Sequence, residues 1–284
     1  MNPKDLATTA LNTWCPGCGN FSILSAMRMV LAQLDDEGYP IENVVLVSGI
    51  GCHAKIVDYM NVNSFYSIHG RTIPVATAIK LANPNLKVIC FSGDGDSLAE
   101  GIDHLIFAAK RNIDLTLILH DNRVYGLTTG QFTPTSPQGF KGKSTPEGAV
   151  EHPMNPLELM LVSGASYIAR GYSHGIEQLQ TLFKEAILHK GFSFVDVLQV
   201  CVSYNNLYES YNKWTYVMQG NDASSFEEAQ KNIRSWDYNS SEAPIPLGKF
   251  YEIDAPRFDQ AFAQYLPNLS ERDSKIKELL ENFI

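Results

Sequence analysis

Short apolar runs alternate along this chain with longer segments in which apolar residues recur every three or four positions. The apolar runs predict buried strands near residues 44–50, 88–92, 115–119, 166–170 and 192–198. The longer segments predict helices near residues 20–34, 74–82, 98–110, 155–163 and 175–189. Because strands and helices alternate, we predict an α/β fold built on a doubly wound, mainly parallel sheet.

The pattern changes after residue 203. Residues 1–203 carry the predicted strand–helix units, and a chain of 284 residues with 44% hydrophobic content can bury a substantial core. Residues 204–284 are richer in aromatic and charged residues and end in a charged helix predicted near residues 270–282. We predict that residues 204–284 form a C-terminal arm that contacts another subunit, although a surface layer of the same domain would give the same pattern.

Two side chains with oxygen ligands follow neighbouring predicted strands. Asp94 lies between Gly93 and Gly95 at the end of one strand, and Asn122 follows the next strand along the chain. One βαβ unit places both at the carboxyl ends of parallel strands, where open α/β sheets bind ligands. Mg²⁺ takes a few protein oxygens and completes its coordination with phosphate and water, and the glycines let the backbone approach phosphates. The pattern predicts a diphosphate site with Mg²⁺, although Gly-Asp-Gly is also common in ordinary turns.

Neighbouring residues strengthen this interpretation. Ser97 stands three positions before Glu100, which predicts a capped helix whose amino end faces an anion. The spacing from Gly93-Asp94-Gly95 to Asn122 resembles the diphosphate-binding signature of thiamine diphosphate enzymes. The resemblance implies that the Asp94 and Asn122 side chains and the backbone carbonyl of Val124 ligate Mg²⁺.

A long segment from Thr128 to His152 is rich in Pro, Gly, Thr and Lys. Loops of this length in a compact domain are usually functional or disordered. Because this loop starts beside Asn122, we expect it to cover the cofactor or the substrate.

The five cysteines are an odd number, and the chain has neither a recognisable signal peptide nor an apolar run long enough to span a membrane. We therefore expect a cytoplasmic protein. Cys15 and Cys18 form a Cys-Pro-Gly-Cys loop, whereas Cys52 and Cys201 each follow a predicted strand. If the strands are parallel, these four thiols can converge beside the diphosphate site. Cys90 lies inside an apolar strand and is expected to be a buried core thiol.

Four converging thiolates suit structural zinc or an iron–sulfur cluster, and the number of ligands does not separate the two. We favour a [4Fe–4S] cluster because it could accept electrons from chemistry on thiamine, whereas zinc would only brace the fold. Two alternatives stay open. A non-oxidative thiamine diphosphate-dependent decarboxylase would explain the diphosphate site, and a non-catalytic zinc-bearing interaction module would explain the cysteines.

Five stretches together carry a more specific resemblance. They are Trp14-Cys15-Pro16-Gly17-Cys18-Gly19, Gly49-Ile50-Gly51-Cys52, His69-Gly70-Arg71, Gly93-Asp94-Gly95-Asp96 and Tyr125-Gly126-Leu127-Thr128-Thr129-Gly130-Gln131. From about Thr13 to about Tyr204 the chain resembles the β subunit of the 2-oxoacid:ferredoxin oxidoreductases. The resemblance implies a thiamine diphosphate-binding fold, thiamine diphosphate, Mg²⁺, coenzyme A as acyl acceptor and ferredoxin as electron acceptor. It also implies one [4Fe–4S] cluster on Cys15, Cys18, Cys52 and Cys201.

Roles for particular residues follow from the same resemblance. Lys55 would bind the substrate carboxylate, His69 would assist proton movement, Arg71 would hold a carboxylate or phosphate, and Leu127 completes the expected catalytic set. Without the resemblance, Lys55, His69 and Arg71 would be ordinary loop residues. The residues expected to bind the cofactor are Gly51, Cys52, His69, Gly93, Asp94, Gly95, Asp96, Asn122, Val124, Tyr125, Gly126 and Leu127.

The stretch from Tyr125 to Gln131 looks more like the 2-oxoglutarate or broad-range branch of the family than the pyruvate-specific branch, so we expect 2-oxoglutarate as substrate. Some family members carry lysine where Thr129 stands. Without that lysine, Lys55, Arg71 or a partner subunit would have to bind a distal carboxylate.

An α subunit is the main expected partner. Thiamine activation needs a carboxylate beside the aminopyrimidine ring, and such enzymes typically place it on a second domain. Asp94 and Asp96 are assigned to the diphosphate end and Glu100 to a helix cap, so the carboxylate is expected from the α subunit. The net charge of −9 argues against nucleic acid. An acidic ferredoxin would need a local basic patch, such as Lys141 with Lys143, or a partner subunit.

Overall fold

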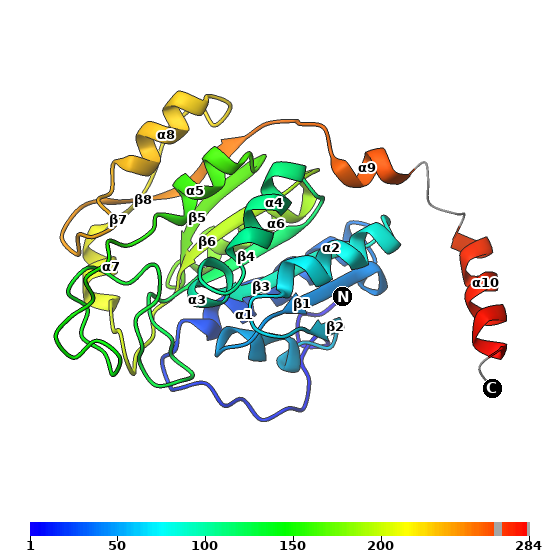
Figure 1. Ribbon diagram of the computed structural model, residues 1–284, viewed down its shortest axis with the longest axis horizontal. Helices are drawn as coiled ribbons and strands as arrows, with labels where there is room; N and C mark the ends of the chain where they lie inside the picture. The colour runs from blue at the N-terminus through cyan, green and yellow to red at the C-terminus, as the bar shows by residue number, and fades with distance from the viewer. Residues whose placement is uncertain (264–268, 283–284) are drawn as a thin grey trace.

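The computed structural model describes residues 1–263 and 269–282. Within these residues, eight strands form one sheet at the centre of the fold (Figure 1). The strands are β1 Val44–Ser48, β2 Asn63–Tyr66, β3 Lys87–Gly93, β4 Thr116–Asp121, β5 Tyr167–Tyr172, β6 Ser193–Leu198, β7 Thr215–Val217 and β8 Ile245–Glu252. Their order across the sheet is β2-β1-β3-β4-β6-β5-β8-β7. Neighbouring strands are parallel except for β5 and β8, which are antiparallel.

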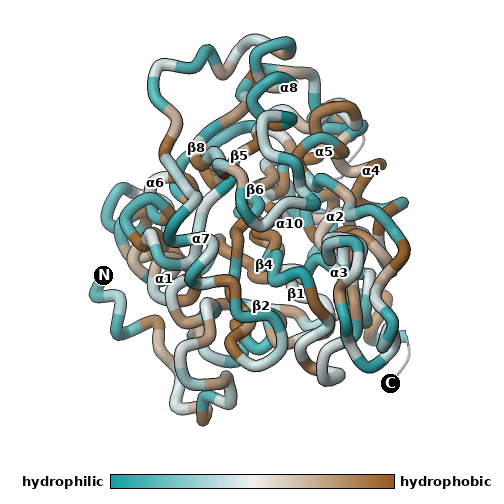
Figure 2. Tube along the Cα trace, turned by 90° about the vertical axis from the view of Figure 1, so that its left-hand side faces the viewer, coloured by the Kyte–Doolittle hydropathy of each residue, from teal (hydrophilic) through white to brown (hydrophobic). Residues whose placement is uncertain are grey.

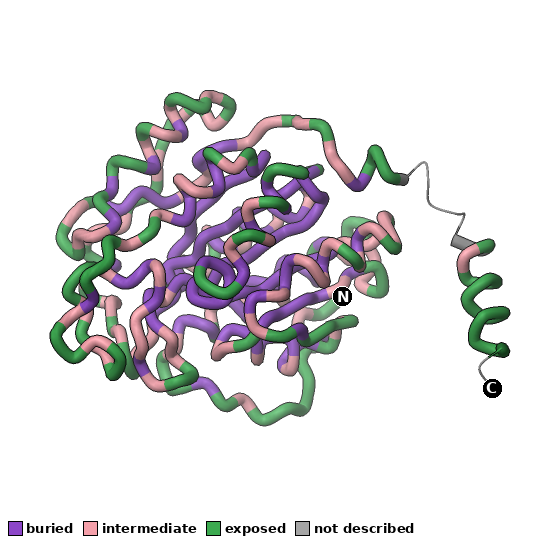
Figure 3. Tube along the Cα trace, in the orientation of Figure 1, coloured by how far each residue is buried: buried purple, intermediate pink, exposed green. Residues whose placement is uncertain are grey.

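Helices cover both faces of this sheet (Figure 1). They are α1 Asn20–Asp36, α2 Thr72–Ala82, α3 Asp94–Leu98, α4 Ile102–Arg111, α5 Pro156–Ser163, α6 Ile176–Leu188, α7 Tyr208–Trp214, α8 Phe226–Arg234, α9 Phe258–Ala263 and α10 Leu269–Glu281, with 3₁₀ segments η1 Ile41–Asn43 and η2 His53–Tyr59. On β3, Ile89 and Phe91 belong to the apolar cluster that includes residues of α1, α6 and η2. Val88 and Cys90 belong to the second cluster, which includes residues of α2, α4, α5 and α8. The central strands are buried between these layers, as Figure 3 shows, whereas β2 at one edge of the sheet is exposed. The predicted doubly wound, mainly parallel fold is confirmed.

The helix predicted near residues 98–110 corresponds to α4, and the separate short helix α3 precedes it. The predicted cap by Ser97 and Glu100 is wrong, because Ser97 lies inside α3 and its hydroxyl donates to Ser92 Oγ at 2.7 Å. Helix α4 begins after Gly101 without a side-chain cap. A Cβ atom on Gly101 would lie 2.7 Å from the carbonyl oxygen of Gly70, so close packing of two loops sets this break.

The segment after residue 203 contributes two strands to the same sheet. β8 pairs with β5, and β7 pairs with β8 at the sheet edge. Trp236 and Tyr238 pack with Tyr172 and Leu198 at the ends of β5 and β6. The predicted charged helix near residues 270–282 corresponds to α10, which is exposed in its described part (Figure 3). Residues 264–268 and 283–284 of the predicted arm lie outside the described residues, and its subunit contact stays a prediction.

The carboxyl ends of β1, β3, β4 and β6 meet at one edge of the sheet because these four strands are parallel and adjacent. In Figure 2, apolar residues run along the central strands, β4 among them, and hydrophilic residues are frequent in the outer loops. Among the described residues, no helix is long and apolar enough to cross a membrane. The loops at this edge carry the predicted site residues.

Candidate functional site

A cavity of about 70 Å³, here called the cofactor cavity, lies at this edge of the sheet. Its lining includes every residue predicted to bind the cofactor: Gly51, Cys52, His69, Gly93, Asp94, Gly95, Asp96, Asn122, Val124, Tyr125, Gly126 and Leu127. The remaining lining residues are Ile50, His53 and Thr128. The separate predictions from four loops therefore converge on one place.

Asp94 begins α3 directly after β3, and its carboxylate is 2% exposed. Its Oδ2 atom accepts hydrogen bonds from Thr133 Oγ1 at 2.5 Å and Thr135 Oγ1 at 2.7 Å. Burial and the nearby Asp121 carboxylate raise the pKa of Asp94 to about 7, against the effect of the two hydroxyl groups. A cation beside Asp94 would favour its charged form, so the donor set fits a metal ion.

The turn after β4 presents Asn122. Its Oδ1 atom accepts from the Val124 N–H at 3.1 Å, and its Nδ2 atom donates to Gln199 Oε1 at 3.0 Å. Arg123 between them has a φ of 60°, and its buried guanidinium donates to the carbonyl oxygen of Thr135 at 2.7 Å. This hydrogen bond links the turn at Arg123, whose backbone is strained, to the loop from Thr128 to His152.

Asp96 organises the loops around the cavity. Its Oδ1 atom accepts from the Gly70 N–H at 2.7 Å and lies 2.8 Å from His69 Nδ1. Its Oδ2 atom accepts from Ser92 Oγ at 2.6 Å and lies 3.3 Å from His53 Nε2. Burial alone would raise the pKa of Asp96, but the two imidazoles and the Gly70 amide more than offset it and hold the pKa well below its ordinary value. Contact with Asp96 in turn raises the pKa of His69, against the effect of burial.

Gly93 and Gly95 also make room for side chains of the protein itself. A Cβ atom on Gly95 would lie 2.2 Å from the Tyr125 ring, and one on Gly93 would lie 2.8 Å from His53 Nδ1. The sequence predicts that these glycines let the backbone approach a phosphate. The structure adds that they allow two rings to reach the wall of the cofactor cavity.

A second cavity of about 240 Å³, here called the cysteine cavity, adjoins the first. Its lining includes the four predicted cluster ligands, Cys15, Cys18, Cys52 and Cys201. Burial raises the pKa of Cys18 to about 12 and of Cys52 to about 11, and the neighbouring thiols add to both shifts. Among residues 1–263 and 269–282, no three His, Cys, Asp or Glu side chains are grouped as around one metal ion. Four thiols that line one cavity are the donor set of sulfur-ligated metal centres.

The cofactor and cysteine cavities have a common wall formed by Cys52, Asn122, Gly126 and Leu127. A Cβ atom on Gly126 would lie 3.6 Å from Cys201 Sγ and 3.7 Å from Cys52 Sγ, so the wall is one residue thick there. Cys90 is fully buried in the core between the sheet and its helices, as predicted.

Of the predicted catalytic residues, His69 and Leu127 line the cofactor cavity, whereas Lys55 and Arg71 do not. Lys55 lines the cysteine cavity instead and forms an ion pair with Asp58. Arg71 lines neither cavity, and its guanidinium donates to the carbonyl oxygens of Gly70 at 3.1 Å and Glu100 at 2.7 Å.

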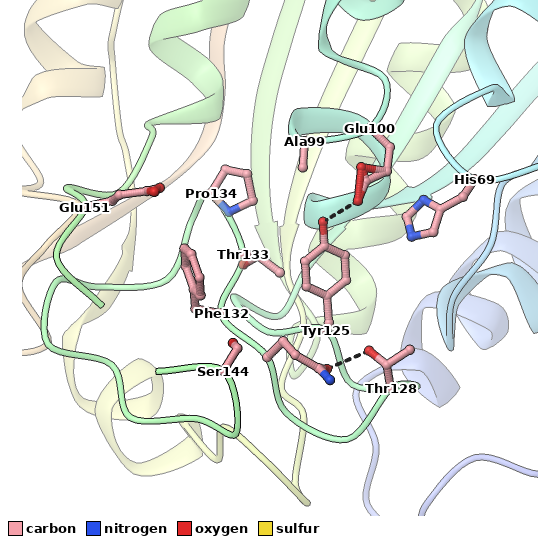
Figure 4. A pocket seen from close by; sticks show the side chains of 11 residues that line it. His69, Ala99, Glu100, Tyr125, Thr128, Phe132, Thr133, Pro134, Ser144 and Glu151 are labelled. Atoms are coloured by element: carbon pink, nitrogen blue, oxygen red, sulfur yellow. Dashed lines mark hydrogen bonds between the residues drawn. The ribbon is translucent and has the colours of Figure 1, made fainter. Parts of the chain in front are cut away.

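A third, larger cavity of about 540 Å³ opens beside the cofactor cavity and shares His69, Tyr125 and Thr128 with it (Figure 4). Figure 4 shows Tyr125 directed at Glu100, whose Oε1 atom accepts from the tyrosine hydroxyl at 2.9 Å. Phe132, Thr133, Pro134, Ser144 and Glu151 of the long loop also line it. The loop from Thr128 to His152 thus borders the site, as expected.

Several residues of the site were not predicted. Thr133 and Thr135 stand in an irregular loop, and His53 and Gln199 are single polar residues after strands. A sequence pattern carries no signal for such contacts, because they depend on how distant loops pack.

Fold and site together define a thiamine diphosphate-binding domain, and comparison with known proteins agrees. The family model described as "Thiamine pyrophosphate enzyme, C-terminal TPP binding domain" matches residues 49–197. The β subunit of 2-oxoacid:ferredoxin oxidoreductase from Saccharolobus solfataricus is 40% identical over 90% of this chain and 87% of its own length. The β subunit of 2-oxoacid:ferredoxin oxidoreductase 1 from Aeropyrum pernix is 43% identical over 93% of this chain and 85% of its own.

A solved structure agrees with these relatives. It is a 2-oxoglutarate:ferredoxin oxidoreductase from Magnetococcus marinus with 2-oxoglutarate, coenzyme A and succinyl-CoA bound. The two chains are 34% identical with a TM-score of 0.88, and the match covers 93% of this chain and 89% of the other. The chain therefore belongs to the β subunits of the 2-oxoacid:ferredoxin oxidoreductases, as its sequence motifs predicted.

Proposed function

We propose that this β subunit holds thiamine diphosphate with Mg²⁺ in the cofactor cavity and a [4Fe–4S] cluster in the cysteine cavity. With an α subunit it catalyses the coenzyme A-dependent oxidative decarboxylation of a 2-oxoacid and passes electrons to ferredoxin. The common wall of the two cavities carries this proposal, because Cys52, Asn122, Gly126 and Leu127 line both. When bound, thiamine supplies the electron sink for decarboxylation and the cluster accepts the electrons singly.

The residues of this chain bind and orient these groups. Asn122 Oδ1, the Val124 carbonyl and Asp94 are the proposed Mg²⁺ ligands. Thr133 and Thr135 both donate to Asp94 Oδ2, so they hold the carboxylate in one orientation for the metal.

The polar side chains predicted to be catalytic already form hydrogen bonds or ion pairs with other residues of the chain. His69, held by Asp96 at the cavity wall, is the proposed proton carrier. Lys55 can receive a substrate carboxylate only by exchanging its ion pair with Asp58. For Arg71 we propose a positioning role, because it joins the carbonyls of Gly70 and Glu100.

We propose 2-oxoglutarate as the preferred substrate. Relatives named as 2-oxoglutarate enzymes, from Mycobacterium tuberculosis and Methanothermobacter thermautotrophicus, are 41% and 42% identical to this chain. Lys143 Nζ donates to Thr129 Oγ1 at 2.5 Å, which brings a cation next to Thr128 at the cofactor cavity and could serve a distal carboxylate. Initial rates with 2-oxoglutarate, pyruvate and 2-oxobutyrate test this choice. A clear preference for pyruvate would contradict it.

We propose that catalysis requires the α subunit. Asp96 is occupied by two histidines, and Glu100 accepts from Tyr125, so neither is available to the aminopyrimidine ring. The test reconstitutes the chain, alone and with its α subunit, with thiamine diphosphate, Mg²⁺, 2-oxoglutarate, coenzyme A and a viologen acceptor. We expect turnover only with the α subunit. Sustained turnover by this chain alone would contradict the assignment.

A further inference from the structure

We propose that Gln199 couples the two halves of the site by orienting the Asn122 amide and donating a hydrogen bond to the Cys18 thiolate. This inference rests on the proposed function, because it assigns Gln199 a positioning role toward the Mg²⁺ and the cluster. The sequence gives Gln199 no distinguishing motif. Directly after β6 it lines the cysteine cavity and contacts Asn122, which lines both cavities.

The amide of Gln199 is fully engaged. The residue is 1% exposed, and its Oε1 atom accepts from Asn122 Nδ2 at 3.0 Å. Its Nε2 atom donates to the Val200 carbonyl oxygen at 2.7 Å and to Cys18 Sγ at 3.5 Å. The opposite orientation would set oxygen against the Val200 carbonyl and two NH₂ groups against each other. The contacts therefore select one orientation of the amide.

Close packing of the Cys-Pro-Gly-Cys loop keeps Cys18 against this amide. The Gly19 N–H donates to the Val200 carbonyl oxygen at 3.1 Å. A Cβ atom on Gly19 would lie 2.8 Å from the Val200 backbone nitrogen and 3.1 Å from Gln199 Cγ. Glycine at this position thus lets the loop approach the end of β6 and bring its thiol to Gln199.

Gln199 acts on both sides through hydrogen bonds. By accepting from Asn122 Nδ2, it acts together with the Val124 N–H, which donates to Oδ1, to hold the amide in the orientation that presents Oδ1 to Mg²⁺. By donating to Cys18 Sγ, it stabilises negative charge on a cluster ligand, and hydrogen bonds to ligand sulfurs adjust cluster reduction potentials. One buried side chain therefore acts on metal affinity in one cavity and electron affinity in the other.

The test uses the αβ complex purified without oxygen. Three quantities are measured: iron content, the cluster midpoint potential by electron paramagnetic resonance titration, and Mg²⁺ affinity by calorimetry with thiamine diphosphate present. Gln199→Leu removes both contacts, so we expect a more negative potential and a Mg²⁺ dissociation constant raised about 10- to 100-fold. Gln199→Glu retains an acceptor for Asn122 but loses the donor to Cys18. We expect it to keep Mg²⁺ affinity near that of the parent and to shift the potential negatively.

Ser203→Ala is the matched control on the cluster side. The Ser203 hydroxyl donates to Cys15 Sγ at 3.2 Å, and Ser203 lines only the cysteine cavity of the two. We expect a shifted potential with unchanged Mg²⁺ affinity.

Potential and affinity like the parent's in Gln199→Leu, with normal iron content, would overturn this inference and leave the proposed function intact. If Gln199→Leu does not assemble, a parent-like potential in Gln199→Glu would overturn it. A parent complex without iron would instead overturn the proposed function.

Discussion

The cofactor cavity and the cysteine cavity are neighbours, but their acidic groups are stabilised in different ways. In the cofactor cavity, contacts from His53 and His69 lower the pKa of Asp96 in spite of burial. In the cysteine cavity, burial raises the pKa of Cys18 to about 12. Asp94 resembles the cysteine, because burial raises its pKa to about 7. Two histidines inside the protein thus stabilise the charged form of Asp96. Among the described residues, the proposed ligands Asp94 and Cys18 have no such partner, and they need a bound cation to favour their charged forms.

Removal of a cluster ligand should have the largest effect. We expect Cys52→Ser to lose most of its iron, because the remaining thiols cannot complete the coordination of a [4Fe–4S] cluster. Cys90→Ser is the control. Cys90 is buried in the core, so this variant should keep iron content near the parent's. Iron and acid-labile sulfide in protein purified without oxygen are the measurements. Equal iron loss in both variants would contradict the ligand assignment.

Removal of the acidic Mg²⁺ ligand should come next. We expect Asp94→Ala to abolish tight binding of thiamine diphosphate with Mg²⁺ while iron content stays normal, because the charge that balances the metal is lost. Calorimetric titration measures the affinity. Asp103→Ala, which changes an exposed carboxylate on α4, is the control. Cofactor affinity equal to the parent's would eliminate Asp94 as a ligand.

Asp96→Asn should lower the stability of the fold. We expect the free energy of unfolding at pH 7 to fall by about 1.5 to 3 kcal/mol, the usual range for a hydrogen bond to a charged group. The folded-state pKa of Asp96 is depressed, so its stabilisation is present above the unfolded value of about 3.9 and is lost as the pH falls below it. Urea denaturation should therefore show the two proteins converging below about pH 4. A difference that does not change with pH would argue against a charged Asp96.

Loss of one contact to Asp94 should have the smallest effect. We expect Thr133→Val to weaken Mg²⁺ binding about tenfold, because a hydroxyl that orients the carboxylate is removed while Thr135 remains. Thr128→Val is the control, since the Thr128 hydroxyl donates to Gln131 Oε1 at 2.6 Å instead of Asp94, and Thr128 lines the third cavity together with Thr133. Equal affinities in these two variants would show that the Thr133 contact does not position Asp94.

The parallel part of the sheet could be predicted because its strands are buried runs. The structure places β3 and β4 where the apolar pattern predicted them. β2 was missed because all four of its positions are exposed at the sheet edge. β8 was missed because Pro246 and Gly248 interrupt its pattern, and its place beside β5 depends on antiparallel pairing between distant segments.

The candidate site shows the same division. Asp94, Asn122 and the four cysteines could be found because their residue types and spacing match known chemistry. Thr133, His53 and Gln199 could not, because each acts through a contact with a residue far away in the sequence. Lys55 and Arg71 were placed by resemblance, and their partners, Asp58 and the Glu100 carbonyl, emerge only from the packed loops.

Metal analysis of the parent protein purified without oxygen tests the central claim most directly, because it asks what the cysteine cavity holds beside the cofactor. We expect iron and acid-labile sulfide in the ratio of a [4Fe–4S] cluster, with a brown colour that bleaches on reduction. Zinc in place of iron, or no metal with the cysteines intact, would contradict it.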